Sequence, residues 1–175
     1  MAASVSYNIE LAEIIEKVQQ VMVTEENMPD LFVSDSSDTH AFVYRADGAF
    51  DYVADFEFSA EQVASSSSHR ELQAVRLALL HNETYFGNLA PLKIYWQTDS
   101  RNLCTFLSKG SKKPSIQKDV FKVKKLEKKL NVMVIAIWTP REHGRIFLAD
   151  LGSKFSLSTD EWSVDRDLLY TICFS

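Results

Sequence analysis

The chain has 175 residues, enough for one domain with a sizeable core, and its 46% hydrophobic and 25% charged residues are typical of a globular protein. No apolar run reaches the roughly 18 residues that a membrane span needs, and the N-terminus has no basic, apolar start of a secretory signal. Two cysteines, Cys104 and Cys173, are too few for a disulfide framework and fit no paired metal spacing. We therefore expect an intracellular protein, cytoplasmic or nuclear, with no membrane partner.

The net charge of −5 is unevenly distributed along the chain. Residues 101–145 contain twelve Lys/Arg against three Asp/Glu, a local balance of +9, so the remainder carries −14. An acidic body with one basic segment is better described by that segment than by its net charge. The overall negative charge therefore does not exclude nucleic acid as a partner.

The first 30 residues have a helical pattern, whereas the chain after them begins with strand patterns. Apolar residues between Asn8 and Val23 follow a helical spacing, with Asn8 as N-cap, and the segment before Pro29 ends the helix. We interpret residues 1–30 as an N-terminal helix and linker, which is either a packing element or the end of a preceding domain. Residues 31–175 then form the main domain.

The main domain begins with strands. The short apolar run at 31–33 is followed by β-favouring runs at 41–44 and 49–58, and Asp47-Gly48 between the last two is a strong hairpin signal. After residue 58, helical and strand patterns alternate along the chain. We expect helices at about 68–85, 102–107, 114–130 and 146–153, strands at 93–98 and 132–138, and a tail at 160–174 that packs back. The strand at 132–138 is continuously apolar, which predicts that both of its faces are covered. This order predicts an α/β fold with a mixed sheet covered by helices.

Four acids lie near the ends of these elements: Asp35, Glu71, Asp99 and Asp150. An acid just past the C-terminal end of a strand can point into the crevice where open α/β sheets bind their ligands. If the fold brings the four carboxylates together, they form a site for divalent metal ions. Hard oxygen ligands select Mg²⁺ or Mn²⁺, and no Cys/His cluster suggests zinc.

Each acid also has a structural interpretation, which the sequence leaves open. Asp35 precedes serines, as a turn residue does, and Asp99 can cap the helix that follows it. Glu71 with Ser68 matches a capping box. Asp150 is the hardest to explain as a structural residue, because it lies inside a helix among apolar neighbours. His143, in the loop before Asp150, is either solvated or a proton carrier near the metal site.

Basic residues concentrate before and on the helix at 114–130. They form either a solvated face or a surface for phosphate contact, and a bias to lysine suits backbone binding without base readout. The candidate nucleic-acid-binding residues are Lys109, Lys112, Lys113, Lys118, Lys122, Lys125 and Arg141.

The acids and their surroundings resemble the ribonuclease H domain of reverse transcriptases, and most closely that of retroelements that encode tyrosine recombinases (DIRS-like elements). The resemblance covers roughly residues 31–170. It rests on Ser34-Asp35-Ser36-Ser37, Ser67-Ser68-His69-Arg70-Glu71-Leu72-Gln73-Ala74-Val75, Thr98-Asp99-Ser100, Lys109-Gly110-Ser111, Trp138-Thr139-Pro140-Arg141-Glu142, Ala149-Asp150 with Ser153-Lys154, and Asp160-Glu161-Trp162.

The resemblance implies a five-stranded mixed sheet, with its first three strands antiparallel, flanked by helices. It implies Asp35, Glu71, Asp99 and Asp150 as catalytic ligands of two Mg²⁺ or Mn²⁺ ions, and His143 as the loop histidine that assists catalysis. The implied activity is endonucleolytic hydrolysis of the RNA strand of an RNA–DNA hybrid. A polymerase domain of the same polyprotein is a further implied partner.

A different class of function is also consistent with the sequence. A domesticated module can keep this fold and bind nucleic acid or a protein partner with weak or no catalysis, and the acidic body and the extra N-terminal helix favour that interpretation. The presence of all four acids favours the enzyme, because an inactive module has no need of Asp150.

Overall fold

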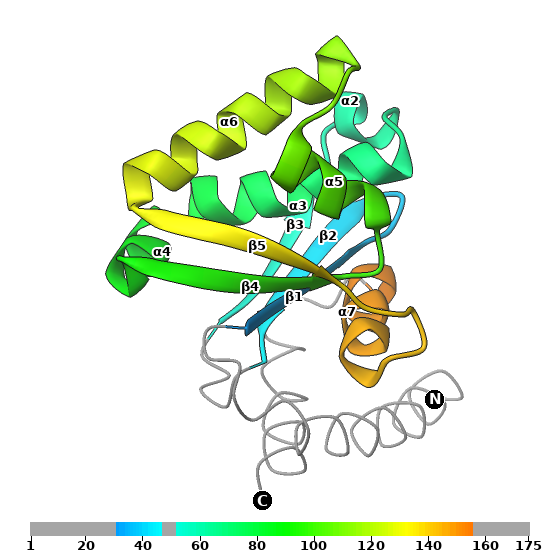
Figure 1. Cartoon of the computed structure of the whole chain (residues 1–175). Helices are drawn as coiled ribbons and strands as arrows, with labels where there is room; N and C mark the ends of the chain where they lie inside the picture. Colours follow the sequence, from blue (N-terminus) through cyan, green and yellow to red (C-terminus); the bar gives the residue numbers. More distant parts are fainter. Residues whose placement is uncertain (1–30, 47–51, 156–175) are drawn as a thin grey trace, which may run out of the picture.

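The structure is a computed structural model, and it describes residues 31–46 and 52–155. The predicted N-terminal helix, the Asp47-Gly48 turn and the C-terminal tail therefore lie outside the described residues. The described part is built on a five-stranded sheet with the order β3-β2-β1-β4-β5 (Figure 1). Its strands are β1 (Leu31–Ser36), β2 (His40–Arg45), β3 (Val53–Glu57), β4 (Leu92–Thr98) and β5 (Val132–Trp138).

The directions of the strands divide the sheet into two halves. β1 pairs antiparallel with β2, and β2 pairs antiparallel with β3. β1 pairs parallel with β4, and β4 pairs parallel with β5. The expected mixed sheet with three antiparallel first strands is confirmed. Because β1 and β4 are parallel neighbours, their carboxyl ends meet at one edge of the sheet.

Helices cover both faces of the sheet (Figure 1). One face is covered by α3 (Ser67–His81), α5 (Arg101–Lys109) and α6 (Pro114–Leu130), and the other face by α7 (Gly144–Phe155), which packs on β1 and β2. Two short helices, α2 (Ala60–Val63) and α4 (Glu83–Leu89), flank α3. No helix in residues 31–46 and 52–155 combines the length and the apolar character that crossing a membrane requires.

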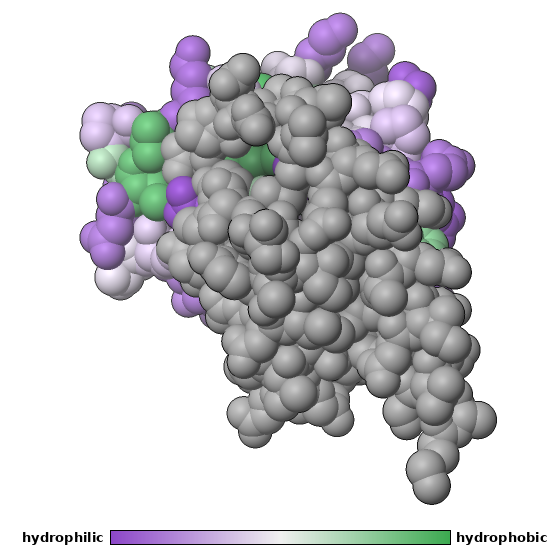
Figure 2. All heavy atoms as spheres, turned by 90° about the horizontal axis from the view of Figure 1, so that it is seen from below, coloured by the Kyte–Doolittle hydropathy of each residue, from purple (hydrophilic) through white to green (hydrophobic). Residues whose placement is uncertain are grey.

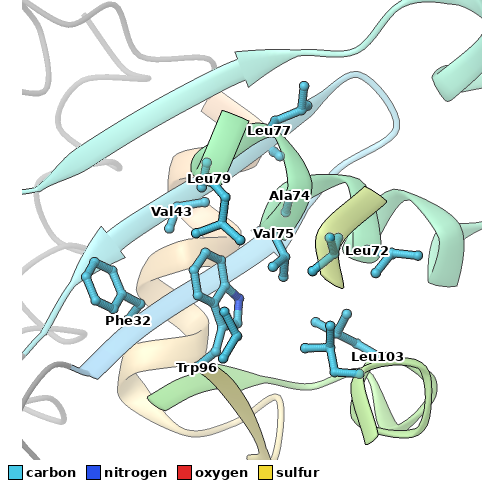
Figure 3. Close-up of a cluster of buried hydrophobic side chains, with 14 of the residues drawn as sticks. Phe32, Val43, Leu72, Ala74, Val75, Leu77, Leu79, Trp96 and Leu103 are labelled. Carbon is cyan, nitrogen blue, oxygen red and sulfur yellow. The ribbon is translucent and has the colours of Figure 1, made fainter. Parts of the chain in front are cut away.

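The core lies between the sheet and α3 (Figure 3). Phe32 of β1 stacks on Trp96 of β4, with ring centroids 5.8 Å apart, and both side chains are fully buried. The indole N–H of Trp96 donates to the Ser34 hydroxyl at 2.7 Å, which satisfies its only polar atom. Leu72 and Val75 pack from α3 onto this layer. Each such side chain contributes about 1.5–3 kcal/mol by burial, so the core holds β1, β4 and the start of α3 in fixed relation.

Some predicted boundaries are wrong. The helix expected at 68–85 is two helices, because Asn82 leaves the helical conformation, and Gly87-Asn88 lies inside α4 instead of ending a helix. Four consecutive serines, 65–68, offered several possible caps, and Ser66 is the N-cap, accepting from the His69 N–H. The predicted Ser68–Glu71 capping box is therefore wrong. A capping box does form on α2, a helix the sequence pattern did not predict, between Ser59 and Gln62.

The expectation that β5 is covered on both faces is also wrong for the described residues. β5 contacts α5 and α6, which cover one face of the sheet, and Met133 is 52% exposed. β5 is also an edge strand. Figure 2 views the molecule from below, where the described residues at the rim are mostly hydrophilic. The largest green group in this view lies on the side where β4 and β5 begin in Figure 1. A continuous apolar run does not reveal whether a strand is central or at an edge, because that depends on the pairing of distant segments.

Candidate metal centre

Two of the acids are brought together by the parallel pairing of β1 and β4. Val33 pairs with Gln97 in the register of these strands. Side chains two residues further along point to the same faces, so Asp35 and Asp99 lie side by side at the carboxyl edge. Ser100, and not Asp99, caps α5, because its hydroxyl accepts from the Leu103 N–H at 3.2 Å. The capping role considered for Asp99 is therefore wrong, and its carboxylate is available to the cleft.

Glu71 joins them from the second turn of α3. Its Oε1 accepts from the backbone N–H of Ser36 at 3.1 Å, which ties the helix to the end of β1. Asp35, Glu71 and Asp99 each present a ligand atom, and these three atoms lie within 4.8 Å of one another. We call these three residues the carboxylate cluster. Asp35 and Glu71 are buried and Asp99 is half-buried, so the cluster lies at the bottom of a depression.

Asp150 approaches the carboxylate cluster from α7 on the other face of the sheet. It is buried, and its carboxyl group is hydrogen-bonded to that of Asp35. Its other contacts are with cations. Lys154 Nζ lies 3.0 Å from Asp150 Oδ2, and Arg141 NH2 lies 3.8 Å from Asp150 Oδ1. All four predicted acids therefore meet at one place, with Asp35 between Asp150 and the other two.

Burial and mutual repulsion raise the pKa values of these acids. The pKa of Asp35 rises to about 8, first because the carboxyl is buried, and further because of its hydrogen bond to Asp150 and the charges of Asp99 and Asp150. Burial also raises the pKa of Glu71 well above its ordinary value, and the charges of Asp35 and Asp99 add to the effect. The pKa of Asp99 is raised by burial, although the Arg141 guanidinium opposes the shift.

The donor atoms suit a divalent metal ion. The cluster offers only carboxylate oxygens, which are the ligands that Mg²⁺ and Mn²⁺ prefer. Glu71 Oε2 is buried and has no hydrogen-bond partner. A buried acceptor without a partner costs about 1–3 kcal/mol, and a cation at the cluster would satisfy it. The residues present therefore fit the ions that the sequence predicted.

The four acids line a cleft that is also lined by basic side chains. Arg141, a predicted nucleic-acid contact, lines this cleft, as do Arg101 and Lys154, to which the sequence interpretation assigned no role. The Arg101 guanidinium stacks over the Trp138 ring, 3.9 Å from its centroid. The spacing of four residues between Asp150 and Lys154 on a helix was the signal that would have predicted their contact.

His143 does not line the cleft that contains the acids. Its Nδ1 accepts from the Arg145 backbone N–H at 3.3 Å at the start of α7. Its catalytic role stays a prediction. The six predicted contact lysines are exposed on α5, α6 and the loop between them, outside the cleft. They are Lys109, Lys112, Lys113, Lys118, Lys122 and Lys125.

No family model and no curated protein match the sequence. Among solved structures, the chain is similar to LC11-RNase H1, isolated from compost by a metagenomic approach, with a TM-score of 0.56 and 15% sequence identity. The match covers 73% of this chain and 97% of the other.

The chain has the ribonuclease H fold. A second similar structure with this fold is the N-terminal RNase H domain of a Mycobacterium tuberculosis protein, solved as a fusion with maltose-binding protein, at 16% identity. It covers 73% of this chain and 99% of that one, with a TM-score of 0.45. At 15% identity, the likeness to LC11-RNase H1 establishes the fold alone, and the chemistry is argued from the carboxylate cluster.

Proposed function

We propose that the protein is an endonuclease that hydrolyses the RNA strand of RNA–DNA hybrids, using two Mg²⁺ or Mn²⁺ ions. The observation that carries this proposal is the carboxylate cluster, with its unpartnered Glu71 oxygen, at the carboxyl edge of β1 and β4. A fold alone does not define an activity, but a site with this chemistry at the ligand-binding edge of the sheet supports one.

The positions of the acids suit distinct roles. Asp35 lies between Asp150 and the pair Glu71 and Asp99, so it would bridge the two ions. Glu71 and Asp99 would hold the first ion and Asp150 the second. When bound, the ions supply Lewis-acid chemistry for an in-line displacement, in which water attacks the phosphodiester and the 3′ oxygen leaves. The hydrogen bond from the Ser36 N–H to Glu71 keeps that carboxylate facing Asp35.

The rest of the proposal concerns the substrate. Arg141 in the cleft and the six exposed lysines named above would contact the phosphates of the hybrid. RNA would be distinguished from DNA by contacts to its 2′-hydroxyl groups and by helix shape. The resemblance to DIRS-like elements supports a natural context in a retrotransposon reverse transcriptase, with a polymerase domain as partner. His143 would assist product release from its loop.

The direct test is cleavage of a hybrid whose two strands carry different labels, with Mg²⁺ or Mn²⁺. We expect cutting of the RNA strand alone, and loss of cutting in Asp99→Asn, which keeps the size of the side chain and removes its charge. Equal cutting by wild type and Asp99→Asn would reject the proposed site, and cutting of both strands would reject the proposed specificity for RNA. Binding of the hybrid without cutting, by a folded wild type, would favour a domesticated binding module.

A further inference from the structure

Asp150 differs from the three acids of the carboxylate cluster in its electrostatic surroundings. Both of its carboxylate oxygens face cations, with Lys154 Nζ at 3.0 Å and Arg141 NH2 at 3.8 Å. In contrast, none of Asp35, Glu71 and Asp99 forms an ion pair with a Lys or Arg in the described part of the chain. At the Asp150 end of the site, the carboxylate is therefore ion-paired with basic side chains, whereas at the carboxylate cluster it is not.

Lys154 is fixed close to Asp150 by the helix that carries both. It lies four residues, about one helical turn, after Asp150 on α7, which brings the two side chains together. α7 itself is tightly held: a Cβ added to Gly152 would lie 2.5 Å from the Phe42 ring, so the helix fits closely on β2 at this point. The backbone position of Lys154 is therefore set, whereas its side chain is 55% exposed and free to change rotamer.

The ammonium group of Lys154 lies at Asp150 Oδ2, one of the two carboxylate oxygens that a second metal ion could use. Asp150 is 8% exposed, so its carboxylate has little free surface, and a cation that binds Oδ2 must displace Lys154. Two positive charges at one carboxylate repel each other strongly at short distance. An ion at the carboxylate cluster displaces no such ion-paired lysine, although the Arg141 guanidinium also acts on Asp99.

We propose that Lys154 is a built-in competitor for the second metal ion, an inference that rests on the proposed two-ion nuclease function. The two ions then bind unequally, the tighter one at Asp35, Glu71 and Asp99 and the weaker one at Asp150. The weaker step sets the metal concentration that cleavage requires. A phosphate of the bound hybrid offers Lys154 another anionic partner, so substrate binding releases Asp150 and favours the second ion.

Calorimetric titration of the substrate-free protein with Mn²⁺ tests the proposal without relying on activity. We expect two binding steps in the wild type and loss of the weaker step in Asp150→Asn. In Lys154→Met, which keeps the length of the side chain without its charge, the weaker step should tighten about three- to tenfold. The tighter step should change less than about twofold. Lys154→Arg keeps the charge and should keep the weaker step weak.

Lys128→Met is the matched control, because Lys128 is an exposed lysine of α6 outside the cleft. It removes the same net charge and should leave both steps unchanged within about twofold. Lys154→Gln repeats the test if Lys154→Met does not fold. An unchanged weaker step in the Lys154 variants would overturn the proposal. A weakened step would also overturn it, because Lys154 would then support Asp150 as a ligand. Wild type that binds no divalent ion would reject the proposed function itself, a different outcome.

Discussion

Helix α3 contributes residues to two groups of polar side chains, and the two groups differ in the partners of their acids. Near Glu71, the acids of the carboxylate cluster face one another. On the side facing α6, Asp119 is surrounded by donors: His69 Nε2 contacts Asp119 Oδ2, and Gln73 Nε2 donates to the same oxygen at 2.7 Å. Lys122 Nζ lies 3.6 Å from Asp119 Oδ1. We call His69, Gln73 and Asp119 the α3–α6 polar cluster.

The comparison separates a structural acid from a functional one. The α3–α6 polar cluster follows the usual rule that a buried charge is paired and hydrogen-bonded, and it joins two helices. The carboxylate cluster violates that rule, because burial and like charges raise the pKa of Asp35 to about 8. Such an arrangement destabilises the metal-free fold, so we interpret it as a binding site and not as a structural link.

The largest expected effect is on the rate of hybrid cleavage, which a substitution in the carboxylate cluster should lower far more than one in the α3–α6 polar cluster. Asp35→Asn should lower hybrid cleavage at least about 1,000-fold, because loss of the bridging charge removes several kcal/mol of transition-state stabilisation. Asp119→Asn should keep cleavage per folded molecule within about threefold. Steady-state rates at saturating Mg²⁺ measure both, and a large loss in Asp119→Asn alone would reverse the assignment of the two clusters.

The second prediction concerns stability. Asp119→Asn should cost about 1–3 kcal/mol, because it replaces a charged acceptor shared by His69 and Gln73. For a chain of this size that corresponds to a fall in Tm of about 2–4 °C for each kcal/mol. Urea unfolding at neutral pH measures the change. No loss of stability in Asp119→Asn would show that the α3–α6 polar cluster does not hold the two helices together.

The third prediction is the pH dependence of the metal-free protein. The folded pKa of Asp35, about 8, lies above its ordinary value of 3.8, so between these values the folded state binds more protons than the unfolded state. The stability that Asp35 contributes is therefore present below pH 3.8 and is lost as the pH rises toward 8.

Thermal unfolding in chelator at pH 6 and pH 8 measures this effect. We expect Tm to be lower at pH 8 by a few degrees, and we expect Asp35→Asn to reduce the difference. Glu71 and Asp99, whose pKa values burial also raises, account for the remainder. A wild-type Tm that rises between pH 6 and pH 8 in chelator would contradict the raised pKa of Asp35.

Local patterns predicted some elements closely. The helix expected at 114–130 and the strand expected at 132–138 coincide with α6 and β5. Pro114 lies in the first turn of α6, and Asn131, with φ of 57°, ends it in the left-handed conformation, so both boundaries have local causes. Asp35 and Asp99 were also identifiable, because the end of a parallel strand can be read from the apolar run before it.

The remaining features depend on tertiary contacts. Glu71 was interpreted as either a cap or a ligand. The N-cap at Ser66 and the hydrogen bond from the Ser36 N–H, 35 residues away, distinguish the two. The pairing of His69 with Asp119 joins residues 50 apart, which no periodicity predicts. The edge position of β5 follows from which strand pairs with β4, and an apolar run carries no information on that.

The central claim is that the carboxylate cluster is a metal site, and a thermal titration tests it most directly. Wild type and Asp35→Asn would be unfolded in chelator and at increasing Mg²⁺ or Mn²⁺. A ligand at 100 times its Kd stabilises the fold by about 2.7 kcal/mol, so wild-type Tm should rise by roughly 5–10 °C at millimolar metal. Tm of Asp35→Asn should start higher in chelator at pH 8 and rise little. No rise in the wild type, or an equal rise in Asp35→Asn, would contradict the claim.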